Sequence, residues 1–179
     1  MIKKFPKSFL ILFTFALSLL ACDAVDDLLT FTITDDIDFE VSSGIPISTP
    51  FEISTPPVES NSKSEFENNN SRVDLVKEIK LKSLNLAITS PEGKTFSFLK
   101  SIKIFISDSN DKNEIELASL DTVPEDAKTI SLETTNTALD AYVKGSSYNL
   151  RTEVVTRETL TETVAINAEM KYQVTADPL

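Results

Sequence analysis

Residues 29–41 read Leu-Thr-Phe-Thr-Ile-Thr-Asp-Asp-Ile-Asp-Phe-Glu-Val. The odd positions are apolar except for Asp35, and every even position is Thr, Asp or Glu. Successive side chains of a β-strand point to opposite faces of its sheet, so this period of two predicts a strand with one face on a core and one in water. Asp35 falls on the core side, and we expect it at a bend in the strand rather than at a ligand site.

A second piece of the same pattern follows at residues 45–53, after an interruption at Gly44. It contains Pro46 and Pro50, and proline cannot donate a hydrogen bond to a neighbouring strand. The sequence therefore predicts an edge strand in two parts, 29–41 and 45–53, which bends near Gly44.

The same alternation dominates the rest of the chain. It predicts further strands at about 79–89, 101–107, 115–117, 130–132, 148–154 and 164–174. The apolar positions change parity near Ser83, which indicates a bulge. Residues 54–71 are polar and predict a loop, in which Phe66 is expected to pack on the domain. Short helices are expected after Ser71 and within 136–144.

These elements predict an all-β fold of about seven or eight antiparallel strands with one or two short helices. The pattern fits an immunoglobulin-like β-sandwich, although the cysteine and tryptophan core of true immunoglobulin domains is absent from the sequence. We expect a single domain over 29–179, because a chain of 179 residues is the usual size of one domain.

The N-terminus has a different composition. Lys3, Lys4 and Lys7 precede an uncharged apolar run over residues 9–21, and Asp23 follows soon after it. A basic start, an apolar run and a short exit segment are typical of a secretory signal peptide. The run is shorter than the roughly 20 residues that a membrane-spanning helix needs. We therefore predict that residues 1–21 are a signal peptide.

The end of this run carries a more specific motif. Residues 19–22, Leu-Leu-Ala-Cys, resemble the lipobox of bacterial lipoproteins at all four positions. The resemblance implies that cleavage leaves Cys22 as the first residue, with a diacylglyceryl group on its thiol and often a further acyl group, such as palmitate, on its amine. Two or more acyl chains give stable membrane anchoring. We expect residues 22–28 to form a lipidated tether; the weaker alternative is that Cys22 is a small buried apolar residue.

The remainder of the chain is similar, by pattern alone, to small β-sandwich lipoproteins of Gram-negative envelopes. That resemblance implies a location in the bacterial cell envelope, with the domain in the periplasm or on the cell surface, and it implies no activity. Asp23 resembles an inner-membrane retention signal of enteric bacteria, which other bacterial groups do not obey. The sequence therefore leaves the choice between inner and outer membrane undecided, and we favour the outer membrane.

Composition excludes several kinds of function. The net charge is −11 and falls to −14 when the three lysines of the signal peptide are removed, which argues against nucleic-acid binding. The chain has no histidine, which excludes Ser-His-Asp catalysis and histidine metal sites. Its one cysteine excludes an intrachain disulfide.

Motifs associated with catalysis or ligands are incomplete. Ser97 and Lys100 have the S-x-x-K spacing of penicillin-binding proteins, but the other motifs of that family are missing. Residues 108–114 are rich in oxygen ligands, but they lack the glycine of a calcium-binding loop and predict a turn. We predict no catalytic, cofactor-binding or metal-binding residue. The tripeptide at 121–123, Asp-Thr-Val, resembles a bacterial O-glycosylation site and makes Thr122 a candidate for modification.

Three functions stay open. The leading hypothesis is a lipid-anchored, non-catalytic interaction or structural module of the cell envelope, with an envelope protein or a glycan as partner and with its edge strand able to accept another strand. The second is a surface carbohydrate-binding lipoprotein, which an exposed row of Tyr142, Tyr148 or Phe105 would favour. The third is a carboxylate-based hydrolase, which would need two close carboxylates in a pocket.

Overall fold

The computed structural model describes residues 30–44, 47–48, 50–69 and 71–177. The predicted signal peptide, 1–21, and the predicted tether, 22–28, lie outside these ranges. The strands are β1 (Thr30–Val41), β2 (Phe51–Ser54), β3 (Val58–Glu59), β4 (Val76–Ser90), β5 (Leu99–Asp108), β6 (Ile115–Leu120), β7 (Thr129–Thr134), β8 (Ser147–Thr156) and β9 (Val164–Ala176). The helices are α3 (Ser62–Asn68) and α4 (Asp140–Val143), and single 3₁₀ turns occur at Val73–Leu75 and Phe96–Phe98.

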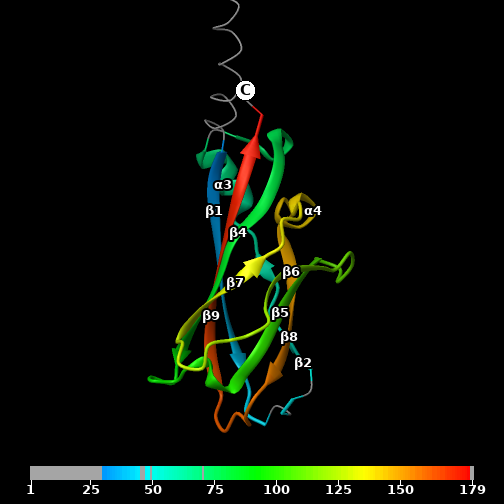
Figure 1. The fold of residues 1–179 in the computed structure, drawn as a ribbon. Helices are drawn as coiled ribbons and strands as arrows, with labels where there is room; N and C mark the ends of the chain where they lie inside the picture. The colour runs from blue at the N-terminus through cyan, green and yellow to red at the C-terminus, as the bar shows by residue number, and fades with distance from the viewer. Residues whose placement is uncertain (1–29, 45–46, 49, 70, 178–179) are drawn as a thin grey trace, which may run out of the picture.

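The strands form one curled antiparallel sheet with the order β1-β9-β4-β7-β6-β5-β8-β2, and β3 pairs with β8 (Figure 1). Strand β7 joins the two layers of the curl, because its residues 129–132 pair with β4 and residues 133–134 pair with β6. The prediction of an all-β, sandwich-like antiparallel fold with two short helices is confirmed.

The core lies between the two layers and follows the sequence period. In β8 and β9 nearly every second residue is buried, and Met170, Tyr172 and Val174 have no exposed surface. Burying an apolar side chain of this size stabilises a fold by about 1.5–3 kcal/mol relative to leaving it exposed. The apolar positions of the alternating pattern are therefore the side chains whose burial stabilises the packing of the two layers.

The two parts of the predicted edge strand lie at opposite edges of the sheet. Strand β1 is the first in the strand order and β2 is the last, so the segment between them crosses from one edge to the other. Gly44 has a φ of +87°, a conformation that suits glycine, and marks the predicted change of direction. The second strand is shorter than predicted and begins at Phe51, directly after Pro50, which has no N–H for a ladder.

The predicted bulge is present in β4, where the register with β9 shifts between Leu81 and Ser83. The prediction of a loop over 54–71 is wrong in part, because β3 and α3 form there. Phe66 explains why this short polar helix is ordered: its ring is completely buried and meets Phe31 of β1 edge to face, with the ring centroids 6.1 Å apart. The helix predicted after Ser71 is a single 3₁₀ turn, because β4 begins at residue 76.

The expectation that Asp35 marks a bend is also wrong. Asp35 lies inside the continuous strand β1, opposite Met170 of β9, and its side chain is buried.

In the ranges that the structure describes, no helix is long and apolar enough to cross a membrane.

Candidate functional site

The curl of the sheet leaves a seam between its two edges. We use the word seam for the lower part of β1 (residues 36–41), the following residues 42–44 and strand β2. Among the described residues β1 pairs with β9 and β2 pairs with β8, and neither pairs with the other. A surface hollow of about 270 Å³ lies at the seam, lined by residues 40–44 and 51–53. The two edges thus approach each other without closing the sheet.

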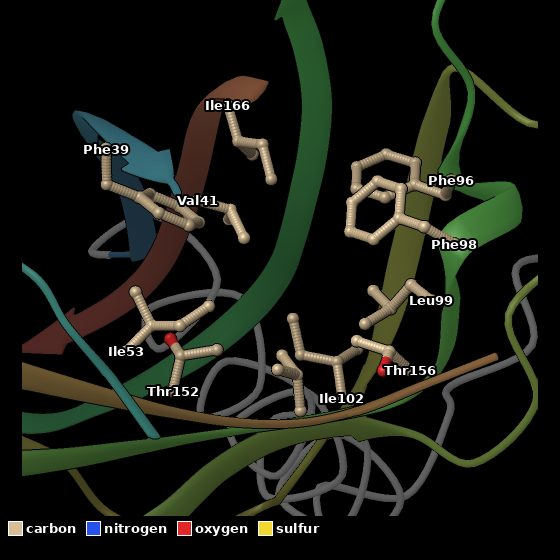
Figure 2. A pocket seen from close by; sticks show the side chains of 11 residues that line it. Phe39, Val41, Ile53, Phe96, Phe98, Leu99, Ile102, Thr152, Thr156 and Ile166 are labelled. Carbon is tan, nitrogen blue, oxygen red and sulfur yellow. The ribbon is translucent and has the colours of Figure 1, made fainter. Parts of the chain in front are cut away.

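The seam is backed by apolar core. A small apolar void of about 10 Å³, the room of about one water molecule, lies on the inner side of Val41 and Ile53. Figure 2 shows Val41, from β1, and Ile53, from β2, pointing into this space from one side, with Phe96 and Phe98 across from them. Val41 and Ile53 line both the outer hollow and the inner void, so two side chains separate the surface from the space between the layers.

The outer rim of the seam combines exposed apolar and acidic side chains. Phe51 of β2 lines the hollow and, at 39%, is one of the two most exposed large apolar residues in the described part of the chain. Asp36, Asp38 and Glu40 follow one another on the solvent face of β1. The seam therefore presents apolar and acidic groups beside an unpaired strand edge.

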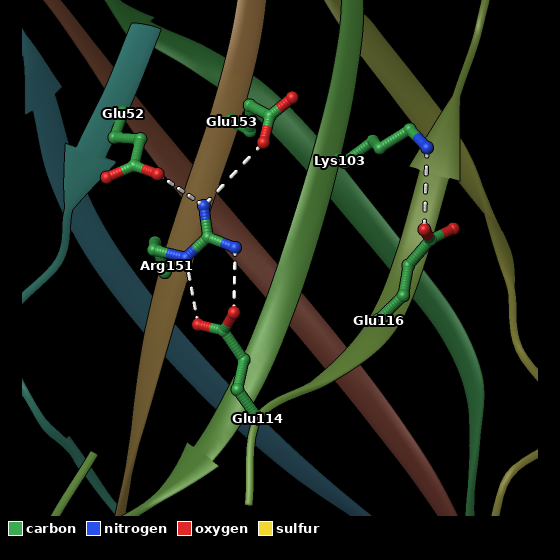
Figure 3. Close-up of polar contacts among 6 residues, drawn as sticks. All are labelled: Glu52, Lys103, Glu114, Glu116, Arg151 and Glu153. Atoms are coloured by element: carbon green, nitrogen blue, oxygen red, sulfur yellow. Dashed lines mark hydrogen bonds and ion pairs between the residues drawn. The ribbon is translucent and has the colours of Figure 1, made fainter. Parts of the chain in front are cut away.

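A cluster of charges lies on the outer face of the layer formed by β6, β5, β8 and β2 (Figure 3). Arg151 of β8 makes a two-pronged contact with Glu114, at 2.8 and 2.7 Å, and contacts Glu52 at 2.8 Å and Glu153 at 3.7 Å. Its guanidinium lies over the ring of Phe105, 4.2 Å from the centroid. One cation thus faces three carboxylates, and Glu52 links this cluster to the rim of the seam.

The pKa shifts in this cluster are those of ion pairs that link neighbouring strands. The hydrogen bonds from Arg151 hold the pKa of the Glu114 carboxyl below its usual value, and the same contact raises the pKa of Arg151. A general acid needs the opposite shift, with its carboxyl held protonated near neutral pH. The cluster connects β2, β8 and the residue before β6, and the lowered pKa of Glu114 is the opposite of what a general acid needs.

A second polar cluster is buried between the layers. The hydroxyl of Tyr148 donates to Asp35 Oδ2 at 2.9 Å and lies 2.9 Å from the hydroxyl of Tyr172. A carboxylate can only accept, so the proton of Tyr148 points to Asp35 and Tyr172 donates to Tyr148. Burial raises the pKa of Asp35 more than the hydrogen bond from Tyr148 and a backbone contact from Asn61 lower it. Among the described residues Asp35 Oδ1 has no hydrogen-bond partner within bonding distance.

The residues singled out from the sequence are spread over the chain. Cys22 lies outside the described residues. Thr122 is exposed in the loop between β6 and β7, so its modification stays a prediction. The hydroxyl of Ser97 donates to Glu158, at 2.8 Å, rather than pairing with Lys100. Asp108 closes the predicted turn, because its carboxylate accepts the backbone N–H groups of residues 110 and 112.

The row of exposed aromatic residues that would favour sugar binding is not formed. Tyr142 and Tyr148 are buried, and Arg151 covers the ring of Phe105. Within the described ranges no group of three or more acidic or sulfur-bearing residues is arranged to hold a metal ion. The sequence reasoning missed the cluster around Arg151: parity places Arg151 and Glu153 on the outer face of β8, but nothing in the sequence pairs them with Glu52 and Glu114.

Comparison with known proteins adds no assignment. No known family matches the sequence, and no curated protein is similar to it. Solved structures with a partly similar chain path include FlhE, at 10% identity over 83% of this chain and 98% of that chain, with a TM-score of 0.35. They also include Desmodium yellow mottle tymovirus, at 13% identity over 84% and 90%, with a TM-score of 0.30, and the decameric BFDV capsid protein, at 10% identity over 81% and 99%, with a TM-score of 0.35. At such TM-scores the likeness carries no argument about function.

Proposed function

We propose that this chain is a lipid-anchored protein of the bacterial cell envelope whose β-sandwich is a non-catalytic binding or structural module. The observation that carries the proposal is the N-terminal sequence, in which an apolar run behind three lysines ends in Leu-Leu-Ala-Cys at residues 19–22. Lipid on Cys22 would hold the domain at a membrane without a spanning helix.

The fold supports the geometry of such an anchor. The first strand begins at Thr30, and covalent geometry limits the distance from Cys22 to Thr30 to about 30 Å. Thr30 pairs with Thr175, so both ends of the described chain lie at the tethered end of the domain. The twelve residues of β1 extend about 40 Å, so the seam at the end of β1 would face away from the membrane.

The two alternatives are less well supported. Carbohydrate binding is disfavoured because Tyr142 and Tyr148 are buried and Arg151 covers the ring of Phe105, so these three do not form a row on which sugar rings would stack. A hydrolase would need a carboxyl held protonated near neutral pH, whereas the hydrogen bonds from Arg151 lower the pKa of Glu114. The acidic composition continues to argue against nucleic acid as a partner, since neutralising phosphates requires a basic surface.

The test is lipid labelling and fractionation of the full chain. The wild-type protein should incorporate labelled palmitate and stay in the membrane fraction, whereas Cys22→Ser should do neither. Ala24→Ser, which changes the tether but keeps the cysteine, is the matched control and should behave as the wild type. Protease treatment of intact cells then separates a surface location, where peptides are released, from a periplasmic one. A Cys22→Ser protein that still carries palmitate would refute the proposal.

A further inference from the structure

We propose that the seam binds an extended, basic segment of a partner protein, which adds as a strand to the free edge of β1. The inference rests on the proposed function in one respect, namely that the domain works by binding a partner, and it is independent of the lipid on Cys22.

The first support is the state of the backbone. In a strand, half of the N–H and C=O groups point to each side, and those on the side of β1 away from β9 make no backbone hydrogen bond over residues 31–41 in the described part of the chain. An edge of this kind is a template for another strand. Natural edges are often blocked by a proline within the strand, and β1 contains none.

The second support is the apolar surface beside that edge. A strand added to β1 would turn alternate side chains inward, toward the half-buried Ile37 and the exposed ring of Phe51 across the hollow. Behind them Val41 and Ile53 lead to the apolar void between the layers. The inward-facing residues of the occupant should therefore be apolar and of moderate size, such as valine.

The third support is charge, which selects the occupant. Asp36, Asp38 and Glu40 form an acidic row on the outer face of β1, and Glu52 lies across the hollow. No described lysine or arginine forms a salt bridge with any member of the row on β1, so a basic strand would meet unneutralised carboxylates.

The same charges disfavour the other occupants. A second copy of the chain would bring an identical acidic row to the edge, and like charges on directly opposed strands are destabilising. The tether over 22–28 contains three aspartates and no basic residue, so it would also be repelled. A basic partner segment with alternating apolar residues is the occupant that fits all three observations.

The experiment measures binding of a defined peptide to the full chain, purified from whole-cell extract in a nonionic detergent at low ionic strength. The probe is a dye-labelled peptide of alternating lysine and valine, about seven residues long, which matches the lower part of β1. Fluorescence anisotropy should show binding of this peptide and not of its glutamate–valine counterpart. A version with N-methyl groups along one edge, which cannot donate to the ladder, should not bind.

Protein variants locate the site. The double variant Asp36→Lys/Glu40→Lys should weaken binding about tenfold, since two favourable charge contacts become repulsive. The matched control is Asp126→Lys/Glu133→Lys, which makes the same charge change at exposed residues of the β6–β7 loop and of β7. The control should change affinity less than about twofold.

Hydrogen exchange gives an independent readout. Bound peptide should slow exchange of amides within residues 36–41 and leave those of β6 and β7 unchanged. Equal loss of affinity in both double variants, binding of the N-methylated peptide, or protection elsewhere would each overturn the proposal. Absence of binding would mean that the acidic row blocks the edge instead of recruiting a strand. None of these outcomes affects the Cys22→Ser experiment, so failure of the seam is distinguishable from failure of the anchor.

Discussion

Removing the hydroxyl of Tyr148 should destabilise the fold by an amount that grows with pH. Tyr148→Phe deletes one oxygen atom and leaves the ring in place, between Asp35 and Tyr172 in a fully buried position. The pKa of Tyr148 is strongly raised by burial, so the phenol stays protonated and remains a donor to Asp35. The variant therefore removes the side-chain hydrogen bond to a buried carboxylate and leaves the weaker backbone contact from Asn61 in place.

The sign of the pH dependence follows from linkage. Burial raises the pKa of Asp35 in the folded state above its usual value of 3.8, so between these two values the folded state holds a proton that the unfolded state has lost. Stability consequently falls as pH rises through that window. Tyr148→Phe removes an interaction that lowers this pKa, so the folded-state pKa rises further and the window becomes wider.

The magnitude follows from the kind of hydrogen bond that is lost. Below pH 3.8 the carboxyl is neutral in both states, and the lost bond should cost about 1 kcal/mol. Once the carboxylate is ionised in the wild-type protein, the cost should rise to about 2–3 kcal/mol, the range for hydrogen bonds to charged groups.

The assay is urea denaturation at several pH values from about 3 to about 8, with Asp35→Asn as the reference background. In that background Tyr148→Phe should cost about 1 kcal/mol at every pH, because no carboxylate is present. Equal costs at low and high pH in the wild-type background, or a cost that falls with rising pH, would refute the assignment of Asp35 as the acceptor.

Three further changes test other parts of the fold. Phe66→Ala should cost about 3–5 kcal/mol and Phe66→Leu distinctly less, measured by urea denaturation, because the buried ring attaches α3 to the core. Gly44→Ala should cost about 1–2 kcal/mol from its positive φ alone, since nothing lies within 4 Å of the added methyl group, and a loss below about 0.3 kcal/mol would contradict this. Arg151→Ala should cost about 0.5–1 kcal/mol near neutral pH, with 1 M salt reducing the loss. That loss should shrink as pH falls through the lowered pKa of Glu114, whose charged form contributes stability above its usual value of 4.5.

The strands could be predicted from the sequence because each is marked by its own local pattern. The alternation over residues 29–41 locates β1 to within one residue, and the parity change at Ser83 locates the bulge in β4. Helix α3 was not predicted, because its seven polar-rich residues have one buried aromatic and no helical period.

The clusters could not be predicted, because their members are distant in the sequence. Asp35 and Tyr148 are 113 positions apart. Local parity shows only an acidic residue on the core side of a strand, which a bend would explain without a partner. Arg151 and Glu52 are separated by 99 positions, and their contact depends on β2 pairing with β8. The seam is a property of the strand order, which the sequence pattern does not determine.

The pairing of β1 with β9 has a consequence for how the protein is made. The first strand of the domain has the last strand as its partner, from Thr30 with Thr175 to Val41 with Val164. Because synthesis begins at the N-terminus, the apolar strand β1 is made first and stays unpaired until the residues of β9 have been added. Contacts between such distant segments form slowly, and the waiting strand is exposed to aggregation. Removal of the last strand should therefore leave β1 without its partner and yield an unfolded chain rather than a smaller domain.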